Sequence, residues 1–250
     1  MEYLTLGKTE LMVSRIAFEL RELQEKNEME DYSVLLQTAY ENGINFFSTN
    51  ARYEYTLETL GTTFEKMRSD IKYCIYSDAI NGIELRNEIG IAIERLGCDS
   101  IEILCLSAEQ FPSVGTADGL YDTYLELKKS GIVKHIALKT SSFNRAQEAI
   151  ISGLYEIITY HFSIASSKAD ESIVQLCENM DIGFLALNPT GDNKLTNIPL
   201  SVGFLDQFED VVSLWKLTTK EKLEEILYFI THPPVMDEKL KKELDDFRTL

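Results

Sequence analysis

The sequence has few basic residues and no long apolar run. Lys and Arg number 24 against 41 Asp and Glu, which gives a net charge of −17 at pH 7. Phosphate backbones and anionic lipid surfaces are bound by clustered lysine and arginine, so we expect neither nucleic acid nor a membrane as a partner. No apolar run approaches the about 18–20 residues that cross a bilayer. The first residues, MEYLTLGKTE, lack the basic stretch and apolar core of a secretory signal. We therefore expect a cytoplasmic protein.

Cysteine is also scarce, and the usual spacings of metal and nucleotide sites are absent. The four cysteines, Cys74, Cys98, Cys105 and Cys177, include no C-x-x-C pair. Cys74 and Cys105 fall in strand-like apolar runs, so we predict that they are structural core residues rather than redox or metal-binding ones. Histidines and carboxylates show no metal-ligand spacing. Neither G-x-G-x-x-G nor the Walker pattern occurs. The sequence thus predicts no metal site and no glycine-rich phosphate loop.

The composition is that of an ordinary globular protein. Hydrophobic residues make up 44% of the chain and charged residues 26%. A length of 250 residues fits one large barrel or two smaller domains. Because no boundary, repeat or low-complexity tract is visible, we predict a single domain over residues 1–250.

Short apolar segments alternate with amphipathic ones along the chain. The apolar segments are rich in Ile, Leu, Val and aromatic residues without strict alternation, which is typical of parallel strands buried on both faces. They are Ile16–Phe18, Ile44–Phe47, Ile71–Tyr76, Ile101–Leu106, His135–Leu138, Ile157–Tyr160, Ile182–Leu187 and Val211–Leu214.

The segments between them have apolar residues at helical spacing. We predict helices over Asp31–Glu41, Ile83–Leu96, Ala117–Lys129, Asn144–Ser152, Ser166–Met180, Thr219–Ile230 and Asp237–Phe247. Gly97 and Gly153 follow two of these segments and are expected to end them, and Asn144 is a candidate N-cap.

Eight strands alternating with helices favour a (β/α)8 TIM barrel over an open sheet. The opening, YLTLGKTELMV, is typical of a β-hairpin that precedes the first barrel strand. Asn188–Pro199 is loop-like and leaves little room for a long seventh helix. We therefore predict an N-terminal β-hairpin and a shortened seventh βα unit.

In such barrels the functional groups come from the carboxyl ends of the strands and from the loops that follow. This rule selects a polar set of mixed charge: Glu19, Arg21, Ser48, Asn50, Tyr53, Tyr76, Asp78, Ser107, Glu109, Lys139, His161, Asn188, Trp215 and Lys216.

Each candidate also has a purely structural interpretation. Tyr53 could cap a loop, Lys139 could extend into solvent or pair with an acid, and Trp215 could be packing rather than a ligand-stacking wall. The acidic residues could be solvated. His161 is the one histidine predicted at a carboxyl strand end, where an imidazole can transfer protons near neutral pH.

Motifs along nearly the whole chain resemble those of the aldo-keto reductase family. They include YLTLGKTELMVSRIAF, AYENGINFFSTNARY, TLETLGTTFEKMRSDI, IAIERLGCDSIEILCLS, GLYDTYLELKKSGIVKHIAL, RAQEAIISGLYEIITYHFS and KEKLEEIL. The resemblance implies a (β/α)8 barrel and carbonyl reduction with NADP or NAD as the cofactor.

The resemblance also implies a catalytic tetrad of Asp, Tyr, Lys and His. The tyrosine protonates the carbonyl oxygen. Because a free tyrosine has a pKa near ~10, a buried lysine must help it. The segment FSTNARY keeps the tyrosine as Tyr53 but has Ser48 in place of the aspartate. The third strand ends near Tyr76 instead of lysine, and the fourth ends at Ser107 instead of histidine.

The positions that meet the cofactor in the family also differ. Lys139 and Thr140 stand where the family has Ser and Asn, and Thr159 replaces a glutamine although Tyr160 is kept. In the last two units, Asn188 replaces a lysine and the phosphate loop is replaced by the run Leu214-Trp215-Lys216-Leu217. The family resemblance thus implies NADP or NAD binding, with residues at the cofactor positions that differ from those of the family.

Three functions stay open. The first is a binding or regulatory protein on this frame, with a small-molecule ligand or a protein partner. The second is an enzyme with non-redox chemistry in which Tyr53, Tyr76, Lys139 and His161 converge. There Lys139 would form a Schiff base or act with Tyr53 in proton transfer. The third is an NAD(P)-dependent oxidoreductase with a modified site. So many replacements favour the first two, because losing a general acid's support alone costs about 10²–10⁴ in rate.

Overall fold

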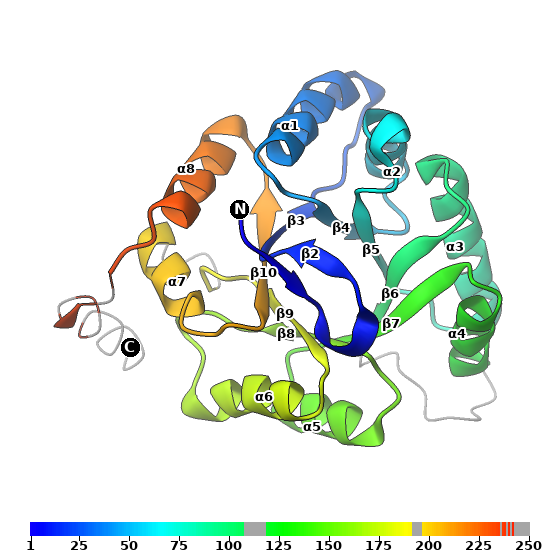
Figure 1. Cartoon of the computed structure of the whole chain (residues 1–250). Coiled ribbons are helices and arrows are strands. Elements are labelled where there is room, and N and C mark those ends of the chain that lie inside the picture. The colour runs from blue at the N-terminus through cyan, green and yellow to red at the C-terminus, as the bar shows by residue number, and fades with distance from the viewer. Residues whose placement is uncertain (108–118, 192–196, 236, 239, 241, 243–250) are drawn as a thin grey trace. The chain divides into compact units, whose positions relative to one another are not determined.

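The computed structural model of the chain describes residues 1–107, 119–191, 197–235, 237, 238, 240 and 242 (Figure 1). Eight parallel strands, in the order β10-β3-β4-β5-β6-β7-β8-β9, close into a barrel. They are β3 (Ile16–Leu20), β4 (Phe46–Asn50), β5 (Lys72–Ser77), β6 (Ile101–Ser107), β7 (Val133–Thr140), β8 (Ile157–His161), β9 (Gly183–Leu187) and β10 (Val211–Leu217). The predicted TIM barrel is confirmed.

Eight α-helices occur in the described part of the chain. They are α1 (Met29–Glu41), α2 (Glu54–Thr63), α3 (Gly82–Leu96), α4 (Leu120–Lys129), α5 (Phe143–Ser152), α6 (Lys168–Asn179), α7 (Ile198–Leu205) and α8 (Lys220–Thr231). Three 3-10 turns accompany them: η1 (Gly7–Thr9), η2 (Lys26–Glu28) and η3 (Glu65–Met67). With 8 residues, α7 forms the shortened seventh unit. Most of the predicted helix over 237–247, and the candidate Glu109, lie outside the described residues.

The predicted hairpin is formed by β1 (Tyr3–Thr5) and β2 (Met12–Ser14), which pair antiparallel with Leu4 opposite Val13. The connection passes close to β9. A Cβ on Gly7 would lie 2.4 Å from the Gly183 nitrogen, and the φ of Gly7 is +52°. Both facts require glycine at this position.

Two predicted helix ends are confirmed and one predicted cap is wrong. Gly97 and Gly153 adopt the left-handed conformation directly after α3 and α5. Asn144 lies inside α5, and the N-cap is Ser142, whose hydroxyl accepts a hydrogen bond from the Arg145 N–H. The chain enters this helix two residues earlier than the apolar spacing indicated.

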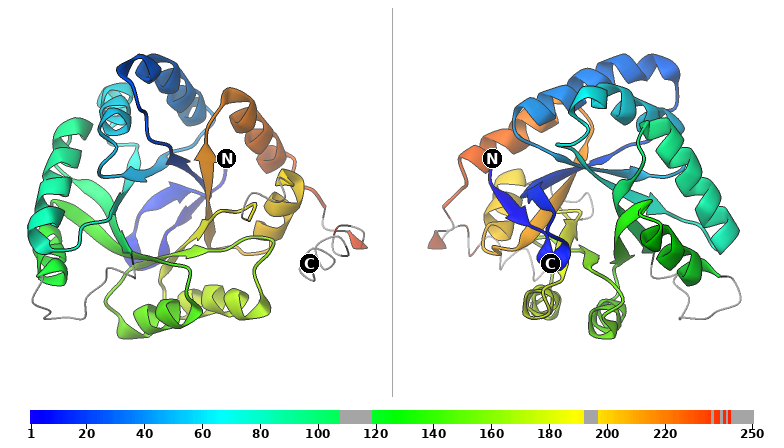
Figure 2. Two further views of the ribbon diagram at one scale, coloured as in Figure 1. Left: turned by 180° about the vertical axis from the view of Figure 1, so that it is seen from behind. Right: turned by 45° about the vertical axis from the view of Figure 1, so that its right-hand side comes forward.

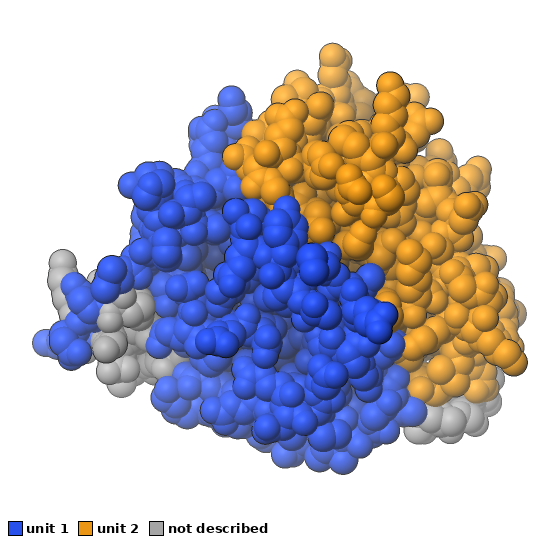
Figure 3. All heavy atoms as spheres, viewed as in Figure 1, with its two compact units in different colours: residues 1–17, 140–250 blue, residues 18–139 orange. Residues whose placement is uncertain are grey.

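The chain divides into two compact units, coloured in Figure 3: residues 1–17 with 140–250, and residues 18–139. We call them unit 1 and unit 2 and describe each by itself. The single domain predicted over 1–250 stays a prediction. None of the helices in the described ranges has the length and apolarity that crossing a bilayer requires.

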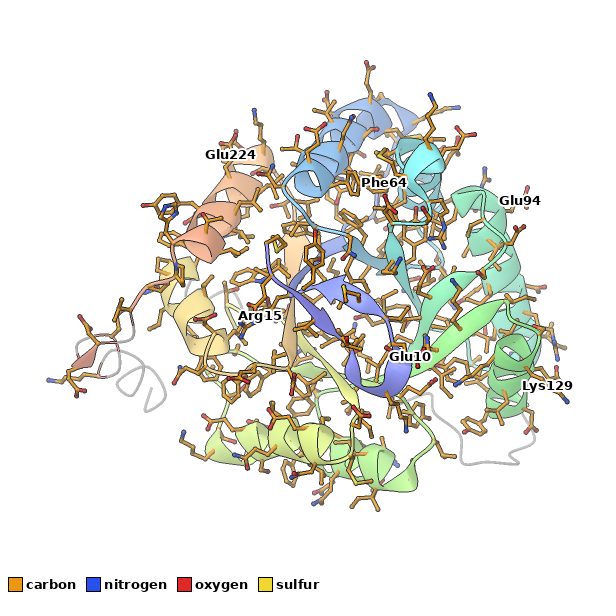
Figure 4. The ribbon with its side chains drawn as sticks, in the orientation of Figure 1. Glu10, Arg15, Phe64, Glu94, Lys129 and Glu224 are labelled. Carbon is orange, nitrogen blue, oxygen red and sulfur yellow. The ribbon has the colours of Figure 1, made fainter. Side chains whose placement is uncertain are left out.

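In unit 2 the helices α1 to α4 lie on the outer side of strands β4 to β7 (Figure 2). Phe64, labelled in Figure 4, is fully buried, and its ring centroid lies 5.1 Å from that of Phe47 on β4.

A buried carboxylate lies at the amino end of this sheet. Glu102 accepts hydrogen bonds from the Tyr73 N–H at 2.9 Å and from Arg68 at 3.2 Å, and pairs with Lys134 at 3.3 Å.

The core of unit 1 contains an aromatic cluster. The ring of Phe162 lies 5.6 Å from Phe184, 5.3 Å from Phe204 and 5.1 Å from Phe208 between centroids. Edge-to-face pairs of this kind add about 0.5–1.5 kcal/mol each beyond their area burial. The cluster therefore joins α7 firmly to strands β8 and β9.

Candidate functional site

A pocket of about 190 Å³ opens at the carboxyl ends of the strands of unit 2. We call it the Lys139 pocket. Its lining residues are Glu19, Leu20, Thr49, Asn50, Tyr53, Tyr76, Ser77, Asp78, Ser107 and Lys139. Four of the six predicted catalytic residues, namely Tyr53, Tyr76, Ser107 and Lys139, are thus brought together.

The strand register explains this convergence. Tyr76 on β5 lies opposite Asn50 on β4 and Cys105 on β6. Ser107, at the end of β6, lies opposite Lys139 near the end of β7. Neighbouring parallel strands in register carry residues of the same height to one end of a barrel, which is where active sites of this architecture form.

Three hydroxyl groups at the base of the site are buried without a hydrogen-bond partner among the described residues. They belong to Ser48, Thr49 and Tyr76, which are 0%, 1% and 6% exposed. Ser48 does not line the pocket. Its hydroxyl lies close enough to the Cys74 thiol and the Tyr76 phenol to lower the pKa of both, although neither contact has the geometry of a formed hydrogen bond. Buried polar groups are nearly always paired, so these hydroxyls are candidates for binding a ligand or an ordered water.

Tyr76 occupies the centre of this group. Its burial raises the pKa of its phenol well above the ordinary value, and the neighbouring Cys74 and Cys105 thiols and the Glu19 carboxylate add to the rise. The Lys139 ammonium lies 4.7 Å from the centre of the Tyr76 ring, within cation–π distance. Lys139 forms no ion pair within the described part of the chain. The phenol therefore stays neutral at physiological pH, with a cation over its face.

Tyr53 stands in the loop between β4 and α2. Its N–H donates to the Asn50 carbonyl at 3.1 Å, and its own carbonyl begins α2 by accepting from the Leu57 N–H at 2.9 Å. Partial burial raises the pKa of the Tyr53 phenol, and the carboxylates of Glu22, Glu19 and Asp78 raise it further. The surroundings of this tyrosine thus oppose its ionisation.

A charged network beside the pocket fixes the loops that carry these residues. Glu88 accepts a hydrogen bond from the Ser77 hydroxyl at 2.6 Å and from Arg52 Nε at 2.6 Å. The Asn50 side-chain amide donates to the Asp78 carboxylate at 2.7 Å. The strand-end rule did not select Arg52 or Glu88. The available signal was Glu88 itself, a carboxylate on the face of α3 that buries Leu85, Ile89, Ala92 and Leu96.

Arg21 does not line the pocket and pairs with Glu28 at 2.6 Å. The remaining predicted catalytic and cofactor-binding residues belong to unit 1. His161 ends β8 and is exposed, and Thr140 ends β7 and is buried, with its hydroxyl accepting from the Ser142 N–H at 3.0 Å. The Tyr160 hydroxyl donates to Asp170 at 2.6 Å, which lowers the pKa of that carboxyl against the opposing effect of burial. Asn188 has a left-handed φ of 49°, and its carbonyl accepts from the Gly191 N–H at 2.8 Å.

The last two predicted cofactor-binding residues lie within β10 rather than after it, because this strand extends to Leu217. Trp215 is 3% exposed, and its indole N–H donates to the Ser213 hydroxyl at 2.8 Å. It lines a second pocket, whose residues all belong to unit 1. Lys216 is exposed on the opposite side of the strand.

The cysteines are free, as predicted. Cys74, Cys105 and Cys177 are buried, and Cys98 is partly exposed. Burial raises the pKa of the Cys177 thiol to about 12. Within the described ranges, no group of three or more His, Cys, Asp and Glu residues could hold a metal ion.

Comparison with known proteins identifies a family. Residues 17–227 match the model of the Aldo/keto reductase family. No curated protein sequence matches the chain. The aldo-keto reductase AKR11C1 from Bacillus halodurans, in its holo form, is 14% identical with a TM-score of 0.81, covering 99% of this chain and 96% of that one. The thermostable aldo-keto reductase Tm1743, in a complex with the inhibitor epalrestat, is 18% identical with a TM-score of 0.81, covering 99% and 100%. At these identities the two solved structures support the fold alone.

Proposed function

The chain belongs to the aldo/keto reductase family, and from this premise we propose that it binds a small polar molecule in the Lys139 pocket without reducing a carbonyl group. The observation that carries the proposal is the neutral, buried Tyr76 at the position where the family resemblance places a lysine. We also propose that the catalytic tetrad of the family does not function here, because three of its residues are replaced and the remaining tyrosine has no lysine at the family's position.

The electrostatics around Tyr53 support it. Family-type carbonyl reduction requires a tyrosine that exchanges its proton near neutral pH, which a nearby ammonium promotes. Here three carboxylates, from Glu22, Glu19 and Asp78, shift the Tyr53 pKa in the opposite direction. The surroundings of Tyr53, the one tetrad residue that the sequence keeps, therefore oppose the proton exchange that the family's reaction needs.

Two of the residues at the family's cofactor positions have no free donor for a nicotinamide cofactor. The Tyr160 hydroxyl donates to Asp170, and the Trp215 indole donates to Ser213. A cofactor that used either donor would have to displace an internal partner, whereas the Thr140 hydroxyl, which accepts from the Ser142 N–H, keeps its own donor. Each charge-assisted bond lost at a cofactor phosphate removes about 1.5–3 kcal/mol.

The pocket itself suits a small ligand with hydrogen-bond acceptors. The Thr49 and Tyr76 hydroxyls are unpaired donors, Ser107 adds another hydroxyl, and Lys139 supplies the cation. Glu19 and Asp78 also line the pocket, and their carboxylates can accept hydrogen bonds from a ligand. A volume of about 190 Å³ limits the ligand to a small molecule. The acidic net charge supports a small molecule or a protein as the partner, and the proposal includes a cytoplasmic location.

The test is a titration of the purified protein with NADPH and NADH, read by fluorescence and calorimetry, together with a panel of carbonyl substrates. We expect no saturable binding at millimolar cofactor and no turnover. A family reductase known to bind the cofactor serves as the positive control. Micromolar binding with turnover would refute the proposal and favour the alternative, an NAD(P)-dependent oxidoreductase with a modified site.

A second candidate function is favoured by one observation: Lys139 lines the pocket without a carboxylate partner among the described residues. Its amine could add to an aldehyde or ketone and lose water to give a Schiff base, which borohydride would reduce to a stable secondary amine. Mass spectrometry should then find the adduct on Lys139 and lose it in Lys139→Met. Lys134→Met, at an ion-paired lysine on the same strand, is the matched control. The absence of an adduct across a carbonyl panel would count against this function.

A further inference from the structure

A second pocket, of about 330 Å³, lies in unit 1 between β10, α7 and the end of α8. Every residue that lines it belongs to this unit, and none belongs to the Lys139 pocket. Arg15, labelled in Figure 4, lies between α7 and β10 at its polar end. The volume is that of a small-ligand site rather than of a packing defect.

One wall of the pocket is apolar. Alternate residues of β10, namely Val211, Ser213 and Trp215, point to the same side of the strand and line the pocket together. Leu205 of α7 and Ile230 of α8 complete the wall from the helices. The indole N–H is already bonded to Ser213, so Trp215 presents its hydrocarbon surface. A ligand therefore needs an apolar body.

The polar end of the pocket is formed by one arginine. Arg15 donates to the Glu2 carboxylate at 2.8 Å and to the Phe208 carbonyl at 2.8 Å, and lies 3.4 Å from the Asp206 carboxylate. Its Nε–H group makes no hydrogen bond among the described residues. The Arg15 side chain is 16% exposed and its Nε is not among the buried polar atoms that lack a partner, so a ligand can reach this donor.

The charges at the polar end of the pocket determine which hydrogen-bond acceptor a ligand should carry. Because the Glu2 and Asp206 carboxylates already lie at Arg15, they would repel a ligand carboxylate that accepted from the free Nε–H group. A neutral carbonyl oxygen could accept from the free donor without breaking either pair. We propose that this pocket binds a neutral small molecule with an apolar body and one carbonyl-type acceptor, through Trp215 and Arg15. This site is independent of the function proposed above.

The chain carries its own reporter for the test. Trp215 is its single tryptophan, so selective excitation of tryptophan reads this pocket directly. The probes are cyclohexanecarboxamide and cyclohexanecarboxylate, which have the same shape, differ in charge and do not absorb with tryptophan. We expect a saturable change with the amide at a Kd on the order of 0.1–1 mM, and binding of the carboxylate at least about fivefold weaker.

Variants place the binding in the pocket. Thr231→Phe adds a ring at the rim from an exposed helix end and should abolish the saturable change. Thr62→Phe is the matched control, because Thr62 is also an exposed helical threonine whose hydroxyl bonds back to a preceding carbonyl, and it should bind as the parent does. Arg15→Lys, which removes the Nε donor and keeps the charge, should weaken amide binding about fivefold. Circular dichroism confirms that each variant is folded.

Each possible result either supports or overturns the proposed site. Saturable amide binding that is lost in Thr231→Phe, kept in Thr62→Phe and weakened in Arg15→Lys would support the site and its ligand class. No saturable change up to about 10 mM amide would overturn the site. A change that survives Thr231→Phe would place the binding elsewhere, and tighter binding of the carboxylate would overturn the neutral ligand class.

Discussion

Replacing Tyr76 with phenylalanine should make the protein more stable. The side chain is 6% exposed on β5, and its hydroxyl has no hydrogen-bond partner among the described residues. Substitutions in a well-packed core usually destabilise, so a gain would show that this hydroxyl does not contribute to folding stability.

The magnitude follows from the hydroxyl group alone. A buried hydroxyl left without a partner costs about 1–3 kcal/mol of desolvation, which Tyr76→Phe would recover. The ring remains beneath the Lys139 ammonium, so most of the cation–π contact is kept. We expect an increase of about 0.5–2 kcal/mol in the free energy of unfolding, or about 2–6 °C in Tm for a chain of this length.

Tyr124 provides a matched control in the same unit. It is fully buried on α4, and its hydroxyl donates to the Leu104 carbonyl and accepts from the Ala137 N–H at 2.8 Å. Tyr124→Phe removes the hydroxyl that bonds to both buried backbone groups. The free energy of unfolding should fall by about 2–4 kcal/mol, opposite in sign to the effect of Tyr76→Phe.

Urea unfolding and calorimetry at pH 7 measure the two variants side by side. The reasoning would be refuted if Tyr76→Phe destabilised the protein as much as Tyr124→Phe does. That result would mean that a partner satisfies the Tyr76 hydroxyl in solution. In that case the unpaired donors at the base of the Lys139 pocket could not be used to infer its ligand.

Three further predictions concern stability. Burial raises the pKa of Tyr32 to about 12, so the folded protein holds this proton more tightly than the unfolded chain does. Stability is therefore complete below pH 10 and falls between about pH 10 and 12, and Tyr32→Phe should remove about 2–3 kcal/mol of that alkaline loss in urea titrations. Gly61→Ala should destabilise by about 2 kcal/mol or more, since its Cβ would lie 2.6 Å from the Leu96 carbonyl oxygen. Gly90 lies within α3 where nothing would contact an added Cβ, so Gly90→Ala should stabilise by about 0.5–1 kcal/mol. A higher Tm for Gly61→Ala than for Gly90→Ala would contradict the packing described at these two glycines. Glu102→Ala leaves its arginine and lysine partners unpaired and should cost about 3–5 kcal/mol; thermal unfolding indistinguishable from that of the parent would show that this buried network contributes nothing.

Most elements of the barrel could be predicted because their apolar residues repeat at the period of the element. The eight strand segments and six of the helices were found in this way, with ends displaced by a few residues. The helix α2 was not predicted. Its sequence, EYTLETLGTT, mixes threonine and glycine into a weak pattern, and packing against α1 and α3 stabilises it instead.

Only part of the candidate site could be predicted from the sequence. The strand-end rule found Tyr53, Tyr76, Ser107 and Lys139, because parallel strands carry their carboxyl ends to one place whatever the loops contain. It missed Arg52 and Glu88, whose ion pair is made across a loop and a helix far apart in the sequence. It also selected Trp215, whose side chain lines a different pocket.

The sequence by itself determined the architecture and the family, since both are read from local pattern and motif. Only the tertiary structure decided what surrounds each candidate residue. The carboxylates near Tyr53, the cation over Tyr76 and the direction of Trp215 depend on side chains contributed by other elements. Electrostatic and packing interactions act through space, and no periodicity along the chain records them.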